Sequence, residues 1–389
     1  MKVARLLCLV IGTMAVALAI APAQAKEGVK ADADGITLTS ADGDFELNLG
    51  GRLQFESMRY DDGTQQTDED DFRRKRLELS GRIGDRLRFR VDREFANVDG
   101  WRNVWLSFRP TDNTEVKSGN FLVPFSMEDL QSSNRIALIE RSAVSALTPG
   151  YSVGAATHFT RKGFTASAGY FSDGIDDEDG RTEERGKGAA GRVTFAPIRD
   201  KGQILHIGAA VEHRSFNTGD VVRFQVKPGS ALAPTLLRTG SISQPNQMSN
   251  VGAELAWSHG DFLFQSQYVA TRLTRETRST LNLDAWYAQV SWVISGQHYE
   301  YSTRSGIFTG VDLKRGKGAV ELAARYSSVD LSDTDFDRGE ATILTLGLNY
   351  YLNENLRFMV NYSPADAEDV RGTPDRNTDV VSAGVQLNF

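Results

Sequence analysis

The sequence predicts an all-β protein, a 16-stranded antiparallel transmembrane β-barrel with an inward-folded third outer loop. Three observations lead to this fold class. The chain opens with the features of a secretion signal, it ends on an alternating segment that stops at the aromatic Phe389, and alternating segments fill most of the sequence between them. Such alternation is typical of strands that face lipid on one side and a polar lumen on the other.

The first segment has the parts of a secretion signal, so residues 1–25 are expected to be a signal peptide. Lys2 and Arg5 form a basic start, Leu6–Ile20 is apolar, and Ala23-Gln24-Ala25 is a cleavage site of small residues. The apolar stretch is too short for a spanning helix. Cys8 is the single cysteine and lies inside this signal, so thiol chemistry and zinc–thiolate sites are excluded from the mature protein.

After the signal we expect a short N-terminal periplasmic segment, 26–44, and then the barrel, 45–389. Loss of the signal removes two basic residues and no acidic ones, which changes the net charge from −7 to −9. The mean hydropathy is −0.35, and no later apolar run approaches the roughly 20 residues of a membrane helix. A transmembrane barrel is consistent with such values because only every second residue faces lipid.

Alternating segments follow one another through the mature chain. In the last one, Val381, Val385 and Leu387 share a face, while polar or small side chains occupy the positions between them. The predicted strands span residues 45–59, 71–82, 86–96, 101–109, 114–122, 151–160, 163–171, 187–196, 203–214, 248–258, 261–273, 281–294, 317–329, 339–351, 355–363 and 378–389.

The connections between these strands support a bacterial outer-membrane barrel, which has short turns on one rim and long loops on the other. Tight links such as 83–85 and 352–354 follow the even-numbered strands, whereas long links such as Tyr60–Asp70 and Ser215–Gln247 follow odd-numbered ones. One link, Ser295–Gly316, is long on the short-turn rim. Aromatic girdles are expected at the strand ends, at Tyr60, Trp101, Tyr151, Tyr170, Trp257, Trp292, Tyr350 and Tyr362.

The period of two also identifies side chains that face the lumen. Leu77 and Leu79 mark the lipid face of the second strand, so Arg74 and Arg76 point inward. Between Asp71 and Arg93 there are nine basic and four acidic residues, although the whole chain is acidic. Guanidinium groups on a lumen wall attract anions and suit phosphate oxygens. The basic residues that this parity assigns to the lumen are Arg52, Arg74, Arg76, Arg82, Arg88, Arg90 and Arg109.

One alternative remains open for these arginines. The arginines can instead pair with the lumen carboxylates Glu46, Glu56, Glu78 and Asp92 and only stabilise the wall. The outer loops are acidic, at clusters such as Asp68–Asp71 and Asp330–Asp337. These clusters are expected to be solvated loop tips, or sites for divalent ions that bridge lipopolysaccharide.

The third outer connection, Val123–Gly150, differs from the others because it carries apolar residues at helical spacing. A long hydrophobic loop is unfavourable in water, so we expect it to fold into the barrel and narrow it. It would then bring Arg135 and Arg141 opposite the arginine-rich wall. Alternatively, the loop packs against a neighbouring subunit or the barrel rim.

The sequence gives little support for an enzyme or for a cofactor-binding protein. The five histidines are dispersed, no serine lies in a nucleophile-elbow motif, and adjacent Glu212 and His213 point to opposite faces of a strand. We therefore expect no catalytic residues, no metal site, no cofactor and no nucleic-acid partner. A purely structural or adhesive barrel stays possible.

Several motifs resemble the phosphate-selective porin O and P family. They are Ser40–Gly43, followed by Gly50-Gly51-Arg52-Leu53-Gln54, then Phe72–Leu77, Gly119–Phe121, Pro124–Ser126, Glu140–Ser142 and Glu321–Ser327. The resemblance implies a trimeric sixteen-stranded barrel with an inward third loop and an anion site. It assigns Arg52, Arg74, Arg76 and Arg141 to the anion path, and leaves Lys75 doubtful because its parity points toward lipid or the rim.

Together these observations predict a passive anion-selective porin for phosphate or polyphosphate in the outer membrane of a Gram-negative bacterium. The alternatives are a general or weakly selective porin for other small organic solutes, or a non-channel structural barrel. The expected partners are outer-membrane lipid and lipopolysaccharide, small anions, two further copies in a homotrimer, and the barrel-assembly machinery, which would read the terminal Phe389.

Overall fold

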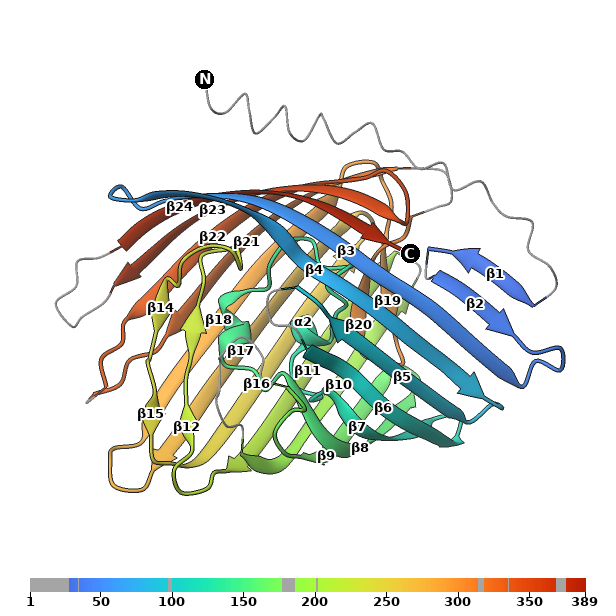
Figure 1. The fold of residues 1–389 in the computed structure, drawn as a ribbon, viewed down its shortest axis with the longest axis horizontal. Helices are drawn as coiled ribbons and strands as arrows, with labels where there is room; N and C mark the ends of the chain where they lie inside the picture. The colour runs from blue at the N-terminus through green and yellow to red at the C-terminus, as the bar shows by residue number, and fades with distance from the viewer. Residues whose placement is uncertain are drawn as a thin grey trace.

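The computed structural model describes residues 28–33, 35–96, 100–176, 186–200, 202–313, 318–334, 336–368 and 376–389. The predicted signal peptide, 1–25, lies outside these residues. Within them, sixteen consecutive strands of one antiparallel sheet pair as nearest neighbours, and the last pairs with the first to close a barrel (Figure 1). The predicted 16-stranded antiparallel barrel is therefore confirmed.

Each barrel strand overlaps one predicted strand, because the alternation that predicts a strand is also what gives the sheet an apolar face and a polar face. The strands are β3 (Phe45–Asp61), β4 (Gln66–Ile83), β5 (Leu87–Glu94), β6 (Gly100–Thr111), β7 (Thr114–Leu122), β8 (Tyr151–Arg161), β9 (Phe164–Phe171), β10 (Lys187–Asp200), β11 (Gln203–Ser215), β16 (Pro245–His259), β17 (Phe262–Arg275), β18 (Leu281–Val293), β21 (Ala319–Asp330), β22 (Glu340–Tyr351), β23 (Leu356–Glu368) and β24 (Arg376–Asn388).

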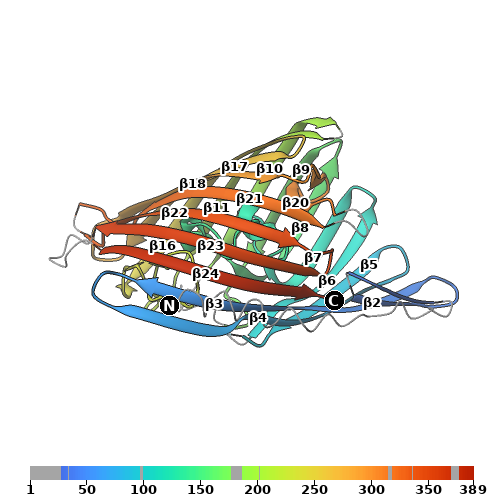
Figure 2. The same ribbon diagram turned by 90° about the horizontal axis from the view of Figure 1, so that it is seen from above.

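A small hairpin precedes the barrel in the segment predicted at 26–44. It consists of β1 (Val29–Asp32) and β2 (Gly35–Thr39), and β2 pairs with the first part of β3 through Ile36↔Leu49. Figure 2 shows this hairpin beyond the end of the barrel to which the C-terminus also returns. The hairpin therefore extends the sheet at the short-turn rim.

The outer surface of the barrel is mostly apolar, whereas the interior carries the polar and charged side chains together with an apolar cluster around the inserted connections. Trp101, Tyr170, Trp257 and Trp292 are exposed on the outside, as predicted for aromatic girdles. Tyr60 was wrongly assigned to a girdle: it is buried with Met58, because it continues the inward parity of Arg52 and Glu56 along β3.

One outer connection is shorter than predicted. Tyr60–Asp70 was expected to be a loop, but β3 and β4 continue outward and pair as far as Asp61↔Gln66. The acidic side chains of this hairpin are exposed on both faces, so solvation does not oppose strand pairing there. The hairpin projects beyond the end of β5, which pairs only as far as Arg76↔Glu94.

Three other connections carry structure of their own. Residues 123–150 contain α2 (Met127–Leu130) and the 3₁₀ helix η2 (Ala143–Ala146). Residues 216–244 form a narrow ribbon in which β12 (Val221–Val222) pairs with β15 (Ile242–Ser243), and β13 (Gln225–Val226) pairs with β14 (Leu237–Arg238). The long link on the short-turn rim forms a hairpin of β19 (Tyr299–Ser302) and β20 (Ile307–Val311).

Much of the buried apolar core lies inside the barrel, where these connections meet the wall. Val144 and Leu147 near η2 belong to the same buried cluster as Phe224 of the ribbon and Leu273 of β17. Among the described residues, no helix is long and apolar enough to cross a membrane. The interior is thus partly filled, and a cavity remains beside β3 to β6.

Candidate functional site

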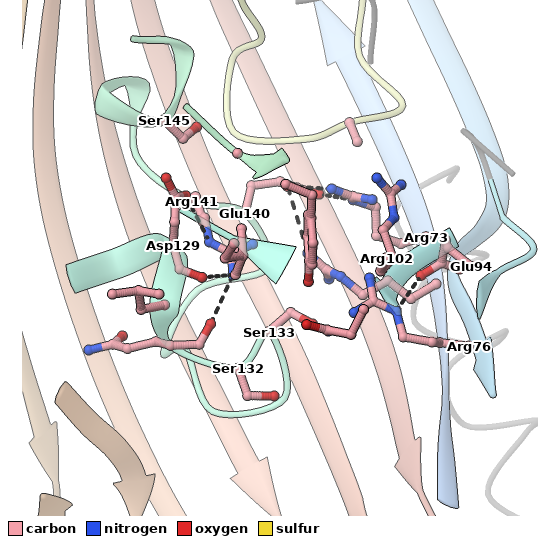
Figure 3. A pocket seen from close by; sticks show the side chains of 18 of the residues that line it. Arg73, Arg76, Glu94, Arg102, Asp129, Ser132, Ser133, Glu140, Arg141 and Ser145 are labelled. Atoms are coloured by element: carbon pink, nitrogen blue, oxygen red, sulfur yellow. Dashed lines mark hydrogen bonds and ion pairs between the residues drawn. The ribbon is translucent and has the colours of Figure 1, made fainter. Parts of the chain in front are cut away.

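A cavity of about 860 Å³ lies between the wall formed by β3 to β6, the third connection (residues 123–150) and the ribbon (Figure 3). Its described lining contains three acidic residues, Glu94, Asp129 and Glu140, against nine basic ones. The basic residues that line it are Arg52, Arg73, Arg74, Arg76, Arg90, Arg102, Lys117, Arg141 and Lys227.

The third connection is tied to itself by polar contacts. The Ser126 hydroxyl accepts a 3.1 Å hydrogen bond from the Asp129 N–H and so caps α2. The buried Glu128 carboxylate accepts bonds from the backbone N–H of Ser142 at 3.0 Å and from its hydroxyl at 2.6 Å. These contacts join the two ends of the connection into one compact unit.

Arginines of the opposite wall bind this connection. Arg325 of β21 donates to Glu128 at 3.1 Å, and Arg357 of β23 donates to the carbonyl oxygen of Ile136 at 2.8 Å. All four of these residues are buried. A buried carbonyl or carboxylate is costly unless it is hydrogen-bonded, so each arginine offsets the burial of the group it holds.

Two wall glycines make room for the same connection. A Cβ on Gly347 would collide with the side chain of Leu138, and one on Gly384 would lie 3.6 Å from Cδ1 of Ile139. The small inward residues Gly347 of β22 and Gly384 of β24 thus have a steric role, since the connection packs directly on the strand backbone there. Larger side chains at Gly347 would push Leu138 away from the wall.

On the cavity side, Arg52 and Arg90 share one carboxylate. Arg52 forms an ion pair with Glu78 and donates to the Ser133 hydroxyl of the third connection at 2.8 Å. Arg90 reaches Glu78 at 2.6 Å and Asp92 at 2.9 Å. The alternative in which lumen arginines pair with lumen carboxylates therefore describes part of this wall, although the basic residues outnumber the acidic ones.

Arg73 faces the cavity because of a β-bulge. Gln54 pairs with Arg74 and Phe55 pairs with Phe72, so Arg73 is the extra residue of a β-bulge in β4. Simple alternation places Arg73 on the lipid face with Leu77. The bulge turns it inward instead, which is why sequence parity missed it.

Arg73 and Arg74 both approach Glu140 of the third connection. Arg73 pairs with Glu140 through two nitrogens, and Arg74 Nη2 lies 4.0 Å from its carboxylate. Burial raises the pKa of Glu140, but the guanidinium of Arg73 outweighs burial and the pKa falls to about 2. Glu140 is thus ionised at neutral pH and fixes the connection to the arginine wall.

Arg141 lines the cavity, but the third connection uses much of its guanidinium. It donates to the carbonyl oxygen of Gln131 at 2.9 Å and forms a 3.3 Å ion pair with Asp129. Arg135 does not line the cavity, since its side chain packs on Gly310 of the β19–β20 hairpin. The two loop arginines named from the sequence therefore have different surroundings.

The remaining predicted arginines lie nearer the short-turn rim. Arg82 is 3.4 Å from Glu46, and Arg109 is 3.1 Å from Glu115. Arg88 lies opposite Arg82 in the β4–β5 ladder. These three lie outside the cavity lining, whereas the structure brings together Arg52, Arg74, Arg76, Arg90 and Arg141 around it.

Sequence reasoning also missed Arg102, Lys117 and Lys227. Lys117 lies on β7, where alternation with the exposed Val116 was available as a signal for its inward direction. Its ammonium lies 4.4 Å from the ring centroid of Trp105. Lys227 belongs to the ribbon, whose position no local pattern predicts.

The β19–β20 hairpin fills the lumen from the short-turn rim. Arg192 of β10 pairs with Glu254 at 2.7 Å and donates to the carbonyl oxygen of Gly306 at 2.7 Å. His206 bridges Glu254 and the Tyr301 hydroxyl, at 3.1 and 2.8 Å. Across the described ranges, no group of three or more His, Cys, Asp or Glu side chains could hold a metal ion.

The ribbon closes the cavity on the outer side. The Ser230 hydroxyl donates to the buried carboxylate of Glu56 at 2.6 Å, and Ala233 packs with Met58 and Val380. Glu56 is therefore engaged by the ribbon. The ribbon, the third connection and the hairpin together leave the cavity beside the arginine wall.

Comparison with known proteins places this arrangement among porins. Residues 47–389 match the family described as phosphate-selective porin O and P. The chain is 24% identical over 385 residues to Porin O of Pseudomonas aeruginosa, covering 86% of each chain. It is 25% identical over 376 residues to an uncharacterized protein of Caulobacter vibrioides, covering 89% of this chain and 75% of that one.

Solved structures show the same fold at lower identity. The anion-selective porin from Comamonas acidovorans gives a TM-score of 0.57 at 14% identity and covers 89% of this chain and 100% of that chain. OmpT of Vibrio cholerae, in a trimer form, gives a TM-score of 0.56 at 13% identity, with 89% and 99% covered. These structures support the barrel architecture, and the family match covers nearly all of the barrel sequence.

Proposed function

The chain belongs to the phosphate-selective porin O and P family and is an outer-membrane porin, and from this premise we propose that it is a passive, anion-selective diffusion channel. One observation carries the proposal, namely the excess of nine basic over three acidic side chains in the described lining of the cavity. Positive charges that line a narrow, low-dielectric passage attract anions and repel cations. The anion's own gradient drives its passage.

The carboxylates on the wall are compatible with conduction. Glu78 and Glu94 already accept bonds from Arg52, Arg90 and Arg76, so an anion that enters must share these guanidinium groups. Sharing reduces the depth of any single site. A channel needs binding that is favourable enough for occupancy and weak enough for release.

Phosphate is the anion we propose, in free or polymeric form. Guanidinium groups present paired N–H donors that match two phosphate oxygens, and several such groups lie around one cavity. The family description and the relative named Porin O support this choice. The second candidate is a weakly selective porin for small organic anions, which the ion pairs on the wall favour because they moderate the local charge.

The test is the zero-current potential of the purified mature protein in a planar bilayer under a KCl gradient, followed by titration with phosphate. The expected sign is that of chloride selectivity, and phosphate at millimolar or lower concentration should reduce the chloride current. A cation-selective sign would overturn the proposal. Chloride selectivity without any effect of phosphate would favour the weakly selective porin.

We also propose how the chain reaches its site. Residues 1–25 act as the export signal, 26–44 stay at the periplasmic side, the barrel-assembly machinery inserts the barrel, and three copies associate in a membrane that contains lipopolysaccharide. The secretion-signal pattern and the fold shared with OmpT of Vibrio cholerae, an outer membrane protein solved in a trimer form, support this. The mass of the detergent-solubilised complex tests the homotrimer, and N-terminal sequencing of the mature protein tests cleavage after Ala25.

A further inference from the structure

The cavity beside the arginine wall has two unlike sides. Strands β3 to β5 contribute arginines, such as Arg76 and Arg90, and no aromatic side chain to its described lining. The aromatic residues of that lining, Trp105, Phe121 and Tyr151, lie on β6, β7 and β8. Basic side chains are present on both sides, so what distinguishes the second side is its ring surface.

Trp105 is held at the edge of the cavity with a fixed orientation. It pairs across the sheet with Gly119, where φ is +131° and an added Cβ would collide with Trp105. The indole N–H donates to the side-chain oxygen of Asn103 at 3.2 Å. Trp105 is half-buried and packs on the buried apolar cluster that includes Phe121. The ring is thus supported from behind while Trp105 borders the cavity.

Apolar surface continues from Trp105 onto the inserted segments. Ala143 and Ala146 of η2 and Val226 of the ribbon line the cavity and belong to the same buried cluster as Phe121. A hydrated inorganic ion gains no free energy from such surface, because its hydration shell is polar. An apolar ring does gain free energy when this surface removes it from water.

Positive charges lie directly beside the ring of Trp105. Arg90 is opposite Trp105 in the β5–β6 ladder, and residues opposite one another have Cβ atoms about 4.5–5.5 Å apart. The Lys117 ammonium lies 4.4 Å from the ring centroid of Trp105. The ion pairs of Arg90 with Glu78 and Asp92 leave its side chain 31% exposed. A ring that carries a charged group can therefore contact Trp105 and a cation at the same time.

The size of the cavity also suits an organic solute. Its volume of about 860 Å³ lies within the roughly 300–1,000 Å³ of pockets that hold organic ligands, which combine apolar and aromatic lining with a few polar groups. Inorganic phosphate fills only a small part of such a volume. The remaining space is bordered by the apolar side described above.

We propose that the cavity binds organic anions that carry an aromatic ring, with aryl phosphates as the substrate class. The ring packs on Trp105, and the phosphate group is shared by Arg90 and Lys117. The inference rests on the proposed function, since it requires anions to enter this cavity. It extends the substrate class from inorganic phosphate to ring-bearing phosphate esters and names Trp105 as the residue that selects them.

The experiment compares how phenyl phosphate and glycerol 3-phosphate reduce the chloride current of the mature protein in a planar bilayer. Both are phosphate monoesters, so they differ in the ring. The half-blocking concentration of phenyl phosphate should be about tenfold lower, as expected for one well-packed aromatic contact. Trp105→Leu should bring the ratio of the two concentrations close to one. Trp257→Leu is the matched control, because Trp257 is exposed on the outer surface, and it should keep the ratio of the parent.

A binding measurement avoids the dependence on current. Trp105 lines the cavity, whereas Trp101, Trp257, Trp286 and Trp292 are exposed on the outside of the barrel. Titration with 4-nitrophenyl phosphate, whose nitro-aromatic ring quenches indole fluorescence at close range, should therefore quench part of the emission in a saturable way. Trp105→Leu should lose most of this quenching, and glycerol 3-phosphate should reverse it only at higher concentration than phenyl phosphate.

The possible outcomes separate this inference from the proposed function. Equal block by the two esters in a chloride-selective parent would overturn the aryl phosphate site and leave the anion channel standing. A Trp105→Leu variant that keeps the ratio and the quenching of the parent would also overturn it. Block by neutral phenol at the concentration effective for phenyl phosphate would show that the charge contributes nothing. A cation-selective parent would overturn the proposed function and this inference together.

Discussion

Two walls of this barrel carry inward arginines, and they use them differently. On the near wall, β3 to β6, Arg52, Arg74 and Arg76 border the cavity. On the far wall, Arg192 and Arg325 are buried against carboxylates and backbone carbonyls of inserted segments. The far-wall arginines hold the constrictions in place, whereas the near-wall arginines face the space that the constrictions leave.

The comparison teaches that the direction of a side chain does not determine its role. Both sets point inward by the same period of two, and both consist of permanently charged groups. The difference lies in what packs against them. The guanidinium groups of Arg192 and Arg325 are enclosed by their partners, whereas those of Arg76 and Arg90 are more exposed beside the cavity and can exchange partners. Four predictions test this division, and the effect expected at neutral pH decreases from the first to the last.

The largest effect is expected for Arg192→Met. Loss of Arg192 leaves Glu254 buried without its arginine partner, which typically costs about 3–5 kcal/mol. The urea midpoint for unfolding from lipid vesicles should therefore fall clearly. Adding Glu254→Gln should recover part of the loss, and no recovery would mean that the contact with Gly306, rather than the charge, is what Arg192 provides.

The next effect is expected for Arg325→Gln, which weakens the attachment of the third connection at Glu128. The connection should move more freely, so single-channel conductance should increase and become noisier while the barrel remains folded. The current traces of the variant and the parent at equal salt concentration give the measurement. An unchanged conductance would show that Arg357 and the packing of the third connection on Gly347 and Gly384 are sufficient to hold it in place.

A smaller and different effect is expected for the near wall. Replacing Arg76 and Arg90 together by Gln should lower the anion-to-cation permeability ratio about tenfold, roughly 1.4 kcal/mol, with a smaller change in the urea midpoint than Arg192→Met, because both side chains keep part of their surface exposed. The zero-current potential measures the ratio, and Arg272→Gln on the outer face is the control. Loss of stability without loss of selectivity would reverse the roles of the two walls.

The last prediction concerns Glu140, and the change in conductance that it describes occurs only at acidic pH. Its pKa is lowered from 4.5 to about 2, so its ion pair stabilises the folded state fully above about pH 4.5 and this contribution is lost as the pH falls toward 2. Conductance should be constant from pH 7 to about 5 and change below pH 4. Glu140→Gln should remove that pH dependence, and a parent that stays constant down to pH 2.5 would contradict the prediction.

The barrel could be predicted from the sequence because the signals for strands are local. Alternation and tight turns lie within each segment of about ten residues, so all sixteen strands could be predicted. The ends of β3 and β4 were missed because their acidic residues were read as a solvated loop. Tyr60 was misplaced for the same reason, since a girdle was expected where β3 in fact continues and its alternation directs the Tyr60 side chain into the barrel.

The site could be predicted only in part. Five of the nine named arginines surround the cavity. Strand parity directs Arg52, Arg74, Arg76 and Arg90 there, and the third connection brings Arg141 to it. Arg73 depends on a bulge, which shifts the register at one residue and leaves no clear pattern in the sequence. The far-wall arginines and Lys227 depend on where distant segments fold, and this arrangement is set by tertiary packing that no window along the chain contains.

The seam between β24 and β3 has a consequence for how the molecule is made. Gly51 and Phe389 exchange backbone hydrogen bonds of 2.6 and 3.1 Å, and the Phe389 ring occupies the space that a side chain on Gly51 would need. These two strands lie at opposite ends of the barrel sequence, so the sheet keeps two unpaired edges until β24 reaches β3. Closure of the barrel thus depends on synthesis of its last strand. A product that lacks β24 keeps exposed strand edges, which are prone to aggregation.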